Sequence, residues 1–256
     1  MSSISIFCPN SINIVAGING IEVAQSIVIA VLILLNDALY LFPTTSTNVA
    51  ATDSHLFSVY LLLPFLGVSL ALLKHNWYPA RVFVGDTYCY FAGMVFAIDA
   101  ILGHWSKTLL LLLVPQIFNF IYSAPQLFGL VPCPRHRLPH FDAKSGLLEP
   151  SVAHFGDSSE AAKQGPKHTK PLRKPVQATL KLLHALRLVR VELDLKTGNV
   201  VRCSNLTILN LWLVWFGPMR EDRLAMSLLV MQMACGLVGL LVRHRLALLV
   251  FTVDNL

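Results

Sequence analysis

Two asparagines near the start of the chain are the first side chains whose type and spacing could serve chemistry. Asn10 and Asn13 are three residues apart, so in a helix they share one face. Gly17 and Gly20 flank Asn19 just beyond, where they would end that helix and expose backbone groups. A carboxamide oxygen is a hard ligand, of the kind that Mg²⁺ takes beside substrate phosphates. An ordinary helix end built from Asn and Gly would look the same, so both interpretations stand.

A single carboxylate, Asp86, stands at the start of a long apolar run, after the polar segment His75–Gly85. An acidic side chain so close to a membrane segment is costly, which suggests that it has a task. Holding Mg²⁺ at the membrane surface is one such task. Asp is also a common helix N-cap, because its oxygens accept from the free backbone N–H groups of the first turn. Asp86 is therefore either a metal ligand or a cap.

Three basic side chains, Arg135, His136 and Arg137, follow one another in a loop that prolines stiffen on both sides. Arginine donates two parallel N–H groups to a phosphate, and the histidine adds a further donor, so the loop could bind a diphosphate. Basic residues beside a membrane span are also common simply as anchors on the cytosolic side. No Gly-rich phosphate loop or catalytic triad motif accompanies them.

The composition shows what must position these residues. Of the 256 residues, 55% are hydrophobic and 13% are charged, with a mean hydropathy of +0.61. A soluble domain of this length cannot bury so much apolar surface in one core. We therefore expect an all-α multi-span membrane protein, with an N-terminal partial helix and about five spans. The five predicted spans are Ile21–Phe42, Leu56–Leu73, Phe83–Gly103, Thr108–Val131 and Leu224–Val242.

The fourth of these spans should be bent or split. It contains Pro115 and Pro125, each of which removes a helical hydrogen bond. The five cysteines are scattered without paired spacing, so they indicate neither a disulfide framework nor a zinc site.

The distribution of Lys and Arg predicts which side of the membrane each loop occupies. Pro132–Arg202 holds seven Lys and six Arg against six acidic residues, a net charge of +7. Such an excess is typical of cytosolic loops. Alternation of the spans then puts residues 1–20 and 74–81 on the same side, and residues 43–55 and 104–107 in the lumen. All three candidate motifs would then lie at the cytosolic face.

Within the basic segment, alternating residues from Val189 to Lys196, a Thr-Gly-Asn turn and Val200-Val201 predict a small β-hairpin. Residues 151–175 are rich in Ser, Gly, Pro and Lys and are typical of a flexible linker. We expect a membrane domain with the motifs over residues 1–131 and the basic cytosolic loop with its hairpin over 132–204. An interfacial helix and the last span would follow over 205–256.

Several stretches taken together resemble the polyprenyl-phosphate sugar-1-phosphate transferase family, and its eukaryotic branch in particular. The Arg-His-Arg sequence stands where bacterial cell-wall members have a histidine-rich motif. The stretches that carry the resemblance are Asn10–Glu22, His75–Met94, Leu102–Thr108, Pro115–Tyr122 and Pro132–Pro139.

The resemblance implies an enzyme of the endoplasmic reticulum membrane, with its active site on the cytosolic face. It implies transfer of N-acetylglucosamine-1-phosphate from UDP-N-acetylglucosamine to dolichyl phosphate with release of UMP, the first step of lipid-linked oligosaccharide assembly for N-glycosylation. Membrane lipid is an expected partner and nucleic acid is not, and the sequence leaves open whether the chain forms a homodimer.

The same resemblance assigns residues by position. Asn13 and Asp86 match the catalytic Mg²⁺ ligands, and Asn19, Arg135, His136 and Arg137 match contacts to UDP-N-acetylglucosamine. The wall that receives dolichyl phosphate is matched by Ile6, Phe7, Cys8, Pro9, Asn10, Ser11, Ile12, Asn13 and Ile14.

The sequence also departs from the family pattern, because it contains no Asp-Asp pair. The resemblance puts such a pair on an earlier loop between spans that precede Asn10 in the family. We therefore expect this chain to be truncated and inactive alone. The alternatives are a non-catalytic membrane fragment that pairs with the full-length enzyme, and a module that binds lipid or nucleotide sugar. Asp99, inside the third predicted span, receives no role from the resemblance.

Overall fold

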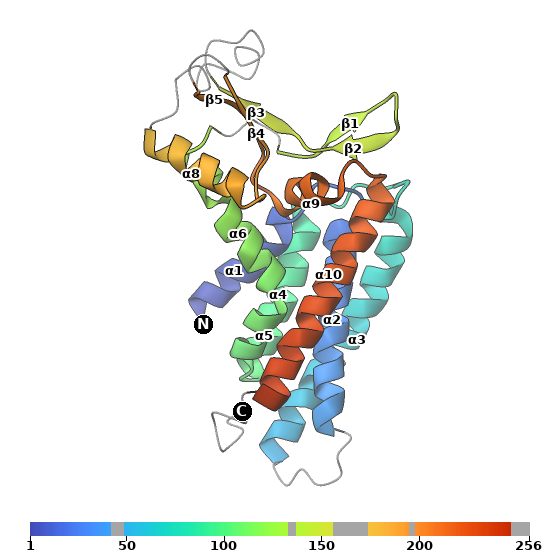
Figure 1. Ribbon diagram of the computed structural model, residues 1–256. Coiled ribbons are helices and arrows are strands. Elements are labelled where there is room, and N and C mark those ends of the chain that lie inside the picture. The colour runs from blue at the N-terminus through green and yellow to red at the C-terminus, as the bar shows by residue number, and fades with distance from the viewer. Residues whose placement is uncertain (42–48, 133–136, 156–173, 195–197, 247–256) are drawn as a thin grey trace. The chain divides into compact units, whose positions relative to one another are not determined.

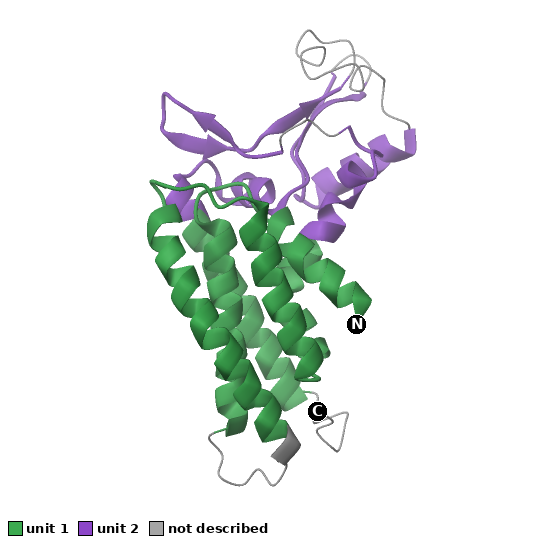
Figure 2. Cartoon of the chain, turned by 180° about the vertical axis from the view of Figure 1, so that it is seen from behind, with its two compact units in different colours: residues 1–118, 225–256 green, residues 119–224 purple. Residues whose placement is uncertain are grey.

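The computed structural model divides the chain into two compact units (Figure 1, Figure 2). The residues that it describes are 1–41, 49–132, 137–155, 174–194 and 198–246. Unit 1 comprises residues 1–118 and 225–256, and unit 2 comprises residues 119–224. Arg135 and His136 lie outside the described residues.

Unit 1 is a bundle of helices (Figure 1). Its apolar runs are long and rich in Leu, Ile and Ala, and a helix satisfies every backbone group within its own segment. Two of the helices, α6 and α10, cross the boundary to unit 2. The helices are α1 Ser2–Ile14, α2 Ile21–Leu41, α3 Val49–Asn76, α4 Asp86–Leu102, α5 Ser106–Leu112, α6 Val114–Leu127, α10 Glu221–Leu241 and the π-helix η2 Val242–Leu246.

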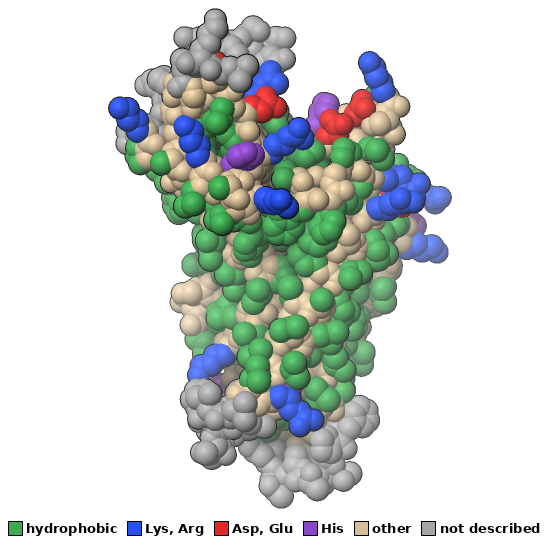
Figure 3. Space-filling model, in the orientation of Figure 1, with side chains coloured by type: hydrophobic (Ala, Val, Ile, Leu, Met, Phe, Trp, Pro, Cys, Tyr) green, Lys and Arg blue, Asp and Glu red, His purple; other side chains and the backbone are tan. Residues whose placement is uncertain are grey.

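The helices of unit 1 are apolar on their outer faces as well as in the core. Ile29, Leu32 and Ile33 of α2 are fully buried, whereas Leu35 and Leu39 on the same helix are 41% and 50% exposed. Hydrophobic side chains cover much of the helical surface in the space-filling view (Figure 3). A helix that is apolar all round is suited to lipid rather than to water.

Among the described residues, three helices are long and apolar enough to cross a membrane: residues 21–41, 51–76 and 221–246. The count rises to four if the bent pair α5 and α6 forms one span. The chain is therefore a multi-pass membrane protein that is mostly helical, with small antiparallel sheets. The predicted span over Phe83–Gly103 corresponds to α4, whose 17 residues fall short of the roughly 20 that usually cross a bilayer.

The predicted break in the fourth span is confirmed. α5 ends at Leu112 and α6 begins at Val114, and the two helices meet at an angle of 68°. The break precedes Pro115, whose ring cannot continue a helix from the preceding turn. Pro125 lies inside α6 and does not end it.

Helices α1 and α4 of unit 1 cross in close backbone contact. A Cβ atom at Gly93 would lie 2.3 Å from the Cα of Pro9, a separation that real atoms do not reach. The two backbones therefore meet where α4 has no side chain, and Cys8, Ile12 and Cys89 pack around the crossing. This contact fixes α1, which carries Asn13, against α4, which begins at Asp86.

We expect Gly93→Ala to destabilise unit 1 by about 1–3 kcal/mol, because the added methyl group forces α1 away from α4. The matched control is Gly67→Ala in α3, where a Cβ would meet nothing within 4 Å. There alanine should be neutral or should stabilise by up to about 1 kcal/mol, because it is the better helix former. Thermal unfolding of the purified chain in detergent measures both. Equal unfolding temperatures for the two variants would contradict the close crossing.

Unit 2 contains a hairpin and a small sheet. Strands β1 His140–Asp142 and β2 Leu147–Glu149 form the antiparallel hairpin. Strands β3 Val152–His154, β4 Val191–Leu193 and β5 Val200–Ser204 form an antiparallel sheet in the order β3-β5-β4. The predicted pairing of the Val191 and Val200 segments is confirmed, with Val191 opposite Cys203.

Part of the predicted linker over residues 151–175 is wrong, because Val152–His154 forms strand β3. Pairing with β5 satisfies its backbone, and Ala153 and Phe155 enter a core with Val191 and Cys203. Residues 156–173 lie outside the described part. Two helices complete the unit, α8 Lys174–Ala185 and α9 Ile208–Phe216. The hairpin of β1 and β2 and helix α8 were not predicted.

Candidate functional site

Asp86 stands in the first turn of α4 with its side chain exposed. The N-cap position belongs to Gly85, whose φ of +59° suits glycine, so Asp86 does not cap the helix. Its carboxylate makes no hydrogen bond or ion pair to a described residue, which leaves it available to a ligand. The preceding loop is fixed, because Asn76 Nδ2 donates to the carbonyl of Val82 over 3.0 Å.

Asn13 lies in the last turn of α1 and is partly exposed. Gln25 of α2 holds this turn, because its Nε2 donates to the carbonyl of Ile12 over 3.0 Å. That carbonyl is one of the last four in the helix, which have no partner within it. Asn10, one turn earlier, uses its own amide in a 2.7 Å bond to the carbonyl of Ile6. Of the two asparagines, Asn13 is therefore the one whose side chain no described residue engages.

Two contacts bring the first two sequence motifs together at one end of unit 1. A Cβ atom at Gly20 would lie 2.9 Å from the ring of Trp77, so the turn before α2 packs on the loop before α4. In addition, Val23 in the first turn of α2 and Cys89 in the first turn of α4 belong to the same buried core. The first turns of α2 and α4 are therefore neighbours.

The segment Ile6–Ile14, predicted to receive dolichyl phosphate, presents two kinds of side chain. Cys8, Ser11 and Ile12 are buried. Ile6, which is 66% exposed, and Asn10 face outward. A lipid could contact this outward stripe of α1, whereas the buried stripe serves packing.

Arg137 is the described member of the basic loop and belongs to unit 2. Its carbonyl accepts from Asn210 Nδ2 over 2.8 Å and from Ser151 Oγ over 3.3 Å, which fixes its backbone. Its Nη1 atom is buried and has no hydrogen-bond partner among the described residues. An unsatisfied guanidinium N–H is costly unless an acceptor arrives, and a phosphate oxygen is its preferred acceptor.

Three buried glutamines form a network inside unit 1 that sequence reasoning missed. Gln116 Nε2 donates to Gln25 Oε1 over 3.1 Å and to Gln232 Oε1 over 2.8 Å. Gln232 Nε2 donates in turn to the carbonyl of Leu112 over 2.8 Å. The network thus connects the break after α5 to the Gln25 contact with α1. Its sequence signal is weak: α2 and α10 each contain one glutamine, and α6 contains Gln126 besides Gln116.

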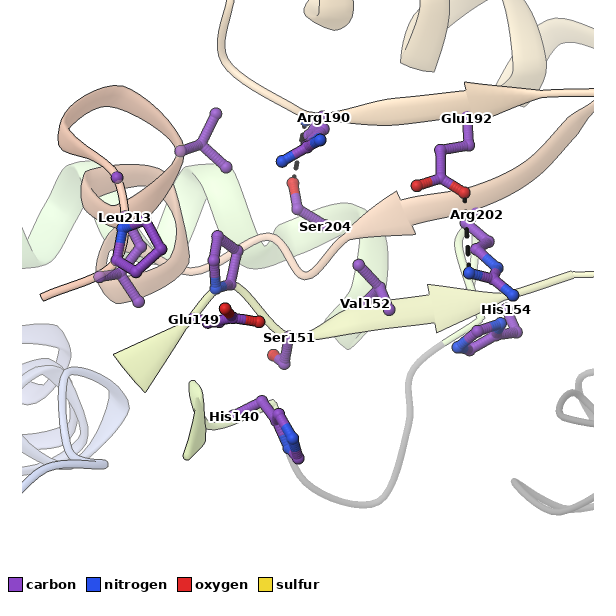
Figure 4. Close-up of a pocket in the computed structure, with 14 residues that line it drawn as sticks. His140, Glu149, Ser151, Val152, His154, Arg190, Glu192, Arg202, Ser204 and Leu213 are labelled. Carbon is purple, nitrogen blue, oxygen red and sulfur yellow. Dashed lines mark hydrogen bonds and ion pairs between the residues drawn. The ribbon is translucent and has the colours of Figure 1, made fainter. Parts of the chain in front are cut away.

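Unit 2 also has a cavity of about 830 Å³ beside the sheet (Figure 4). Charged side chains of both signs line the cavity, and among them Arg202 approaches Glu192 to 3.8 Å. In the same lining, the backbone N–H of Arg190 donates to Ser204 Oγ over 3.1 Å. Burial raises the pKa of the nearby Cys203 thiol to about 12, so it stays protonated and unreactive. None of the predicted site residues lines this cavity.

The described residues contain no group of three or more His, Cys, Asp and Glu side chains that could hold a metal ion. A Mg²⁺ site needs fewer protein ligands, because it keeps several waters and binds substrate phosphates. Asn13 and Asp86 offer an amide oxygen and a carboxylate that no described residue engages, and both are hard donors. The residues present therefore fit Mg²⁺ and would not fit a soft metal.

Comparison with known proteins defines the class. Residues 1–104, which contain α1, α2, α3 and α4, match the family described as Glycosyl transferase family 4. The relatives below are similar along nearly the whole chain. Over residues 1–104 the chain is therefore similar to this family.

Three proteins similar to this chain share one name, UDP-N-acetylglucosamine–dolichyl-phosphate N-acetylglucosaminephosphotransferase. The one from Saccharomyces cerevisiae is 56% identical over 256 residues, which is all of this chain and 54% of that protein. The one from Schizosaccharomyces pombe is 51% identical over 256 residues, again all of this chain and 55% of that protein. The one from Dictyostelium discoideum is 41% identical over 250 residues, 94% of this chain and 49% of that protein. The chain spans about half the length of these relatives.

Proposed function

We propose that this chain serves the transfer of N-acetylglucosamine-1-phosphate from UDP-N-acetylglucosamine to dolichyl phosphate. The observation that carries the proposal is the exposed Asp86, unengaged by any described residue, at the start of α4 beside the turn before α2. Both segments belong to the part that matches the family, and the relatives are named for this reaction.

In the proposed reaction, an oxygen of dolichyl phosphate attacks the β-phosphorus of the nucleotide sugar. The bond from that phosphorus to the bridging oxygen breaks, and UMP leaves with the oxygen. The new P–O bond joins the two phosphates of dolichyl-diphospho-N-acetylglucosamine. No covalent bond to the protein is needed, so the chain's role is positioning and charge stabilisation.

The proposed roles follow from the placements above. Asp86 and Asn13 would hold Mg²⁺, which when bound neutralises phosphate charge. The outward stripe of α1 would receive the dolichyl phosphate, and Asn19 would contact the nucleotide. Arg137, with Arg135 and His136, would hold the diphosphate and the sugar. The buried Nη1 of Arg137, which no described residue engages, supports this role.

We further propose that the protein lies in the endoplasmic reticulum membrane with these residues at the cytosolic face. The net charge of +7 on Pro132–Arg202 supports that orientation. A fifth span formed by α4 is part of this proposal. At 17 residues it is about 25 Å long, which is near the lower limit for a membrane helix.

The test is a transfer assay in microsomes prepared from cells that express the chain from its natural gene. With labelled UDP-N-acetylglucosamine and dolichyl phosphate, we expect dolichyl-diphospho-N-acetylglucosamine and UMP in equal amounts. Release of UDP instead of UMP would mean that the sugar moves without its phosphate, and the proposal would be wrong. Microsomes prepared from cells that lack the gene give the background transfer activity.

We expect the Asn205-Leu206-Thr207 sequon to remain unglycosylated, because glycosylation occurs in the lumen. The structure adds a second reason: Asn205 is 1% exposed, accepts from Gln126 Nε2 over 2.8 Å and donates to Ser151 Oγ over 2.9 Å. Gel mobility with and without glycosidase measures this. A glycosidase-sensitive shift that Asn205→Gln abolishes would overturn the proposed orientation.

A further inference from the structure

Four polar side chains meet inside unit 1, away from the candidate site. They are Asp37 of α2, His55 and Ser58 of α3, and Asp99 of α4, and each is at most 1% exposed. Asp99 follows Asp86 by 13 residues on the same helix, which places it about 20 Å further along the axis. The proposed transfer reaction uses none of the four.

Ser58 connects the two acids. Its Oγ lies 2.6 Å from Asp37 Oδ2 and 3.0 Å from Asp99 Oδ2. A hydroxyl has one hydrogen and can therefore donate to only one of the two carboxyls. The other contact is attractive only if that carboxyl itself carries a hydrogen and donates to Ser58.

The surroundings decide which carboxyl that is. Asp37 receives a second contact, because His55 Nδ1 lies 2.7 Å from its Oδ1. Asp37 thus has a donor for each oxygen, as an ionised carboxylate requires. Asp99 has no such support: its Oδ1 is buried and has no hydrogen-bond partner among the described residues. An ionised Asp99 would be a buried charge with one shared contact, which is highly unfavourable.

His55 fits the same arrangement in its neutral form. Its Nε2 is buried and has no partner among the described residues. A hydrogen on Nε2 would be a buried donor without an acceptor, so the single hydrogen of the ring belongs on Nδ1, facing Asp37. In this arrangement His55 donates to one oxygen of Asp37 and Ser58 donates to the other. Asp99 in turn donates to Ser58.

No described Lys or Arg neutralises either acid directly. On the side of α2, Tyr40 stacks on the His55 ring with centroids 4.3 Å apart. On the side of η2, Arg243 Nη2 donates to the Tyr40 hydroxyl over 3.3 Å, and His244 Nε2 lies 3.0 Å from Asn36 Oδ1. The guanidinium therefore approaches the cluster through the tyrosine and does not pair with Asp37 or Asp99.

We propose that Asp37, His55, Ser58 and Asp99 form a proton-binding site within the helical unit, with the bound proton on Asp99. The proton turns Asp99 into a donor and so joins α4 to α3 and α2. Its loss would leave two carboxylates around one hydroxyl, and the repulsion would loosen these three helices. This inference does not depend on the proposed transfer reaction.

Infrared spectroscopy of the purified chain at neutral pH tests the proposal directly. A protonated carboxyl has a C=O stretching band that an ionised carboxylate lacks. We expect such a band, shifted when the chain is made with aspartate labelled with ¹³C at its side-chain carboxyl carbon. It should be lost in Asp99→Asn and retained in Asp53→Asn, the matched control at an exposed aspartate of α3. Absence of the band from the unchanged chain, or its persistence in Asp99→Asn, would overturn the proposal.

A second measurement uses stability. The folded chain keeps a proton on Asp99 that the unfolded chain loses at about pH 4, so folding stability should fall as pH rises from about 4 until Asp99 loses its proton in the folded chain as well. Asn at position 99 stays neutral and still offers an N–H to Ser58. We therefore expect the decrease in Tm with pH in Asp99→Asn to be at most about half that of the unchanged chain. Equal decreases in Tm for the two proteins would contradict a proton at Asp99.

Discussion

In the protein expressed from its natural gene, Asp86→Ala is expected to abolish transfer activity while leaving the protein folded. The side chain is exposed and unengaged by any described residue, so its loss removes no internal contact. Loss of a ligand that stabilises the transferring phosphate costs several kcal/mol, which corresponds to a fall in kcat on the order of 10³-fold. The measurement is kcat for transfer in microsomes, with the amount of protein normalised by immunoblot.

The matched control is Asp53→Ala, which removes an exposed carboxylate from α3 and should leave kcat unchanged. Asp86→Glu keeps the carboxylate but moves it by one methylene, so partial activity should return at high Mg²⁺ concentration. Near-normal kcat in Asp86→Ala would show that this residue holds no metal needed for turnover.

Arg137→Ala is expected to raise the KM for UDP-N-acetylglucosamine by about 10- to 100-fold with a smaller change in kcat. The buried Nη1 atom has no described partner, so a phosphate oxygen would gain a charge-assisted hydrogen bond there. Such bonds contribute about 1.5–3 kcal/mol. An effect on binding of substrate and transition state alike appears in KM.

Arg190→Ala provides the comparison, because Arg190 is an exposed arginine of the same unit that lines the separate cavity. Its removal should leave KM unchanged. Arg137→Lys keeps the charge but loses the paired N–H donors, and should recover only part of the affinity. Equal KM values for Arg137→Ala and the unchanged protein would remove Arg137 from the proposed site.

The membrane elements could be predicted from the sequence because their signal is local. A run of apolar residues defines α2 from Ile21 to Leu41, against the predicted Ile21–Phe42. Pro115 predicted the break between α5 and α6. The third span was predicted to begin at Phe83, whereas α4 begins at Asp86 and Gly85 takes the cap position, a detail that depends on backbone conformation.

The elements that were missed depend on contacts between distant residues. Strand β3 has three residues and exists because β5, some 50 residues later, pairs with it. The hydrogen bond from Gln232 to the carbonyl of Leu112 joins residues that are 120 positions apart, and no local sequence pattern predicts it. The two contacts of Ser58 could likewise not be predicted, because Asp37 and Asp99 approach it from two other helices. Pairings of this kind decide which polar residues in an apolar helix have partners.

The break between α5 and α6 has a consequence for biogenesis. The carbonyl of Leu112 accepts from Gln232, which lies on α10 and is therefore synthesised 120 residues later. Until α10 has entered the membrane, this acceptor at the break lacks its partner, and Gln116 lacks one of its two acceptors. Helices α1 to α6 thus wait in a state with exposed polar groups in lipid, of the kind that chaperones and quality control recognise. Arrival of the last helix completes the bundle and ends that vulnerable interval.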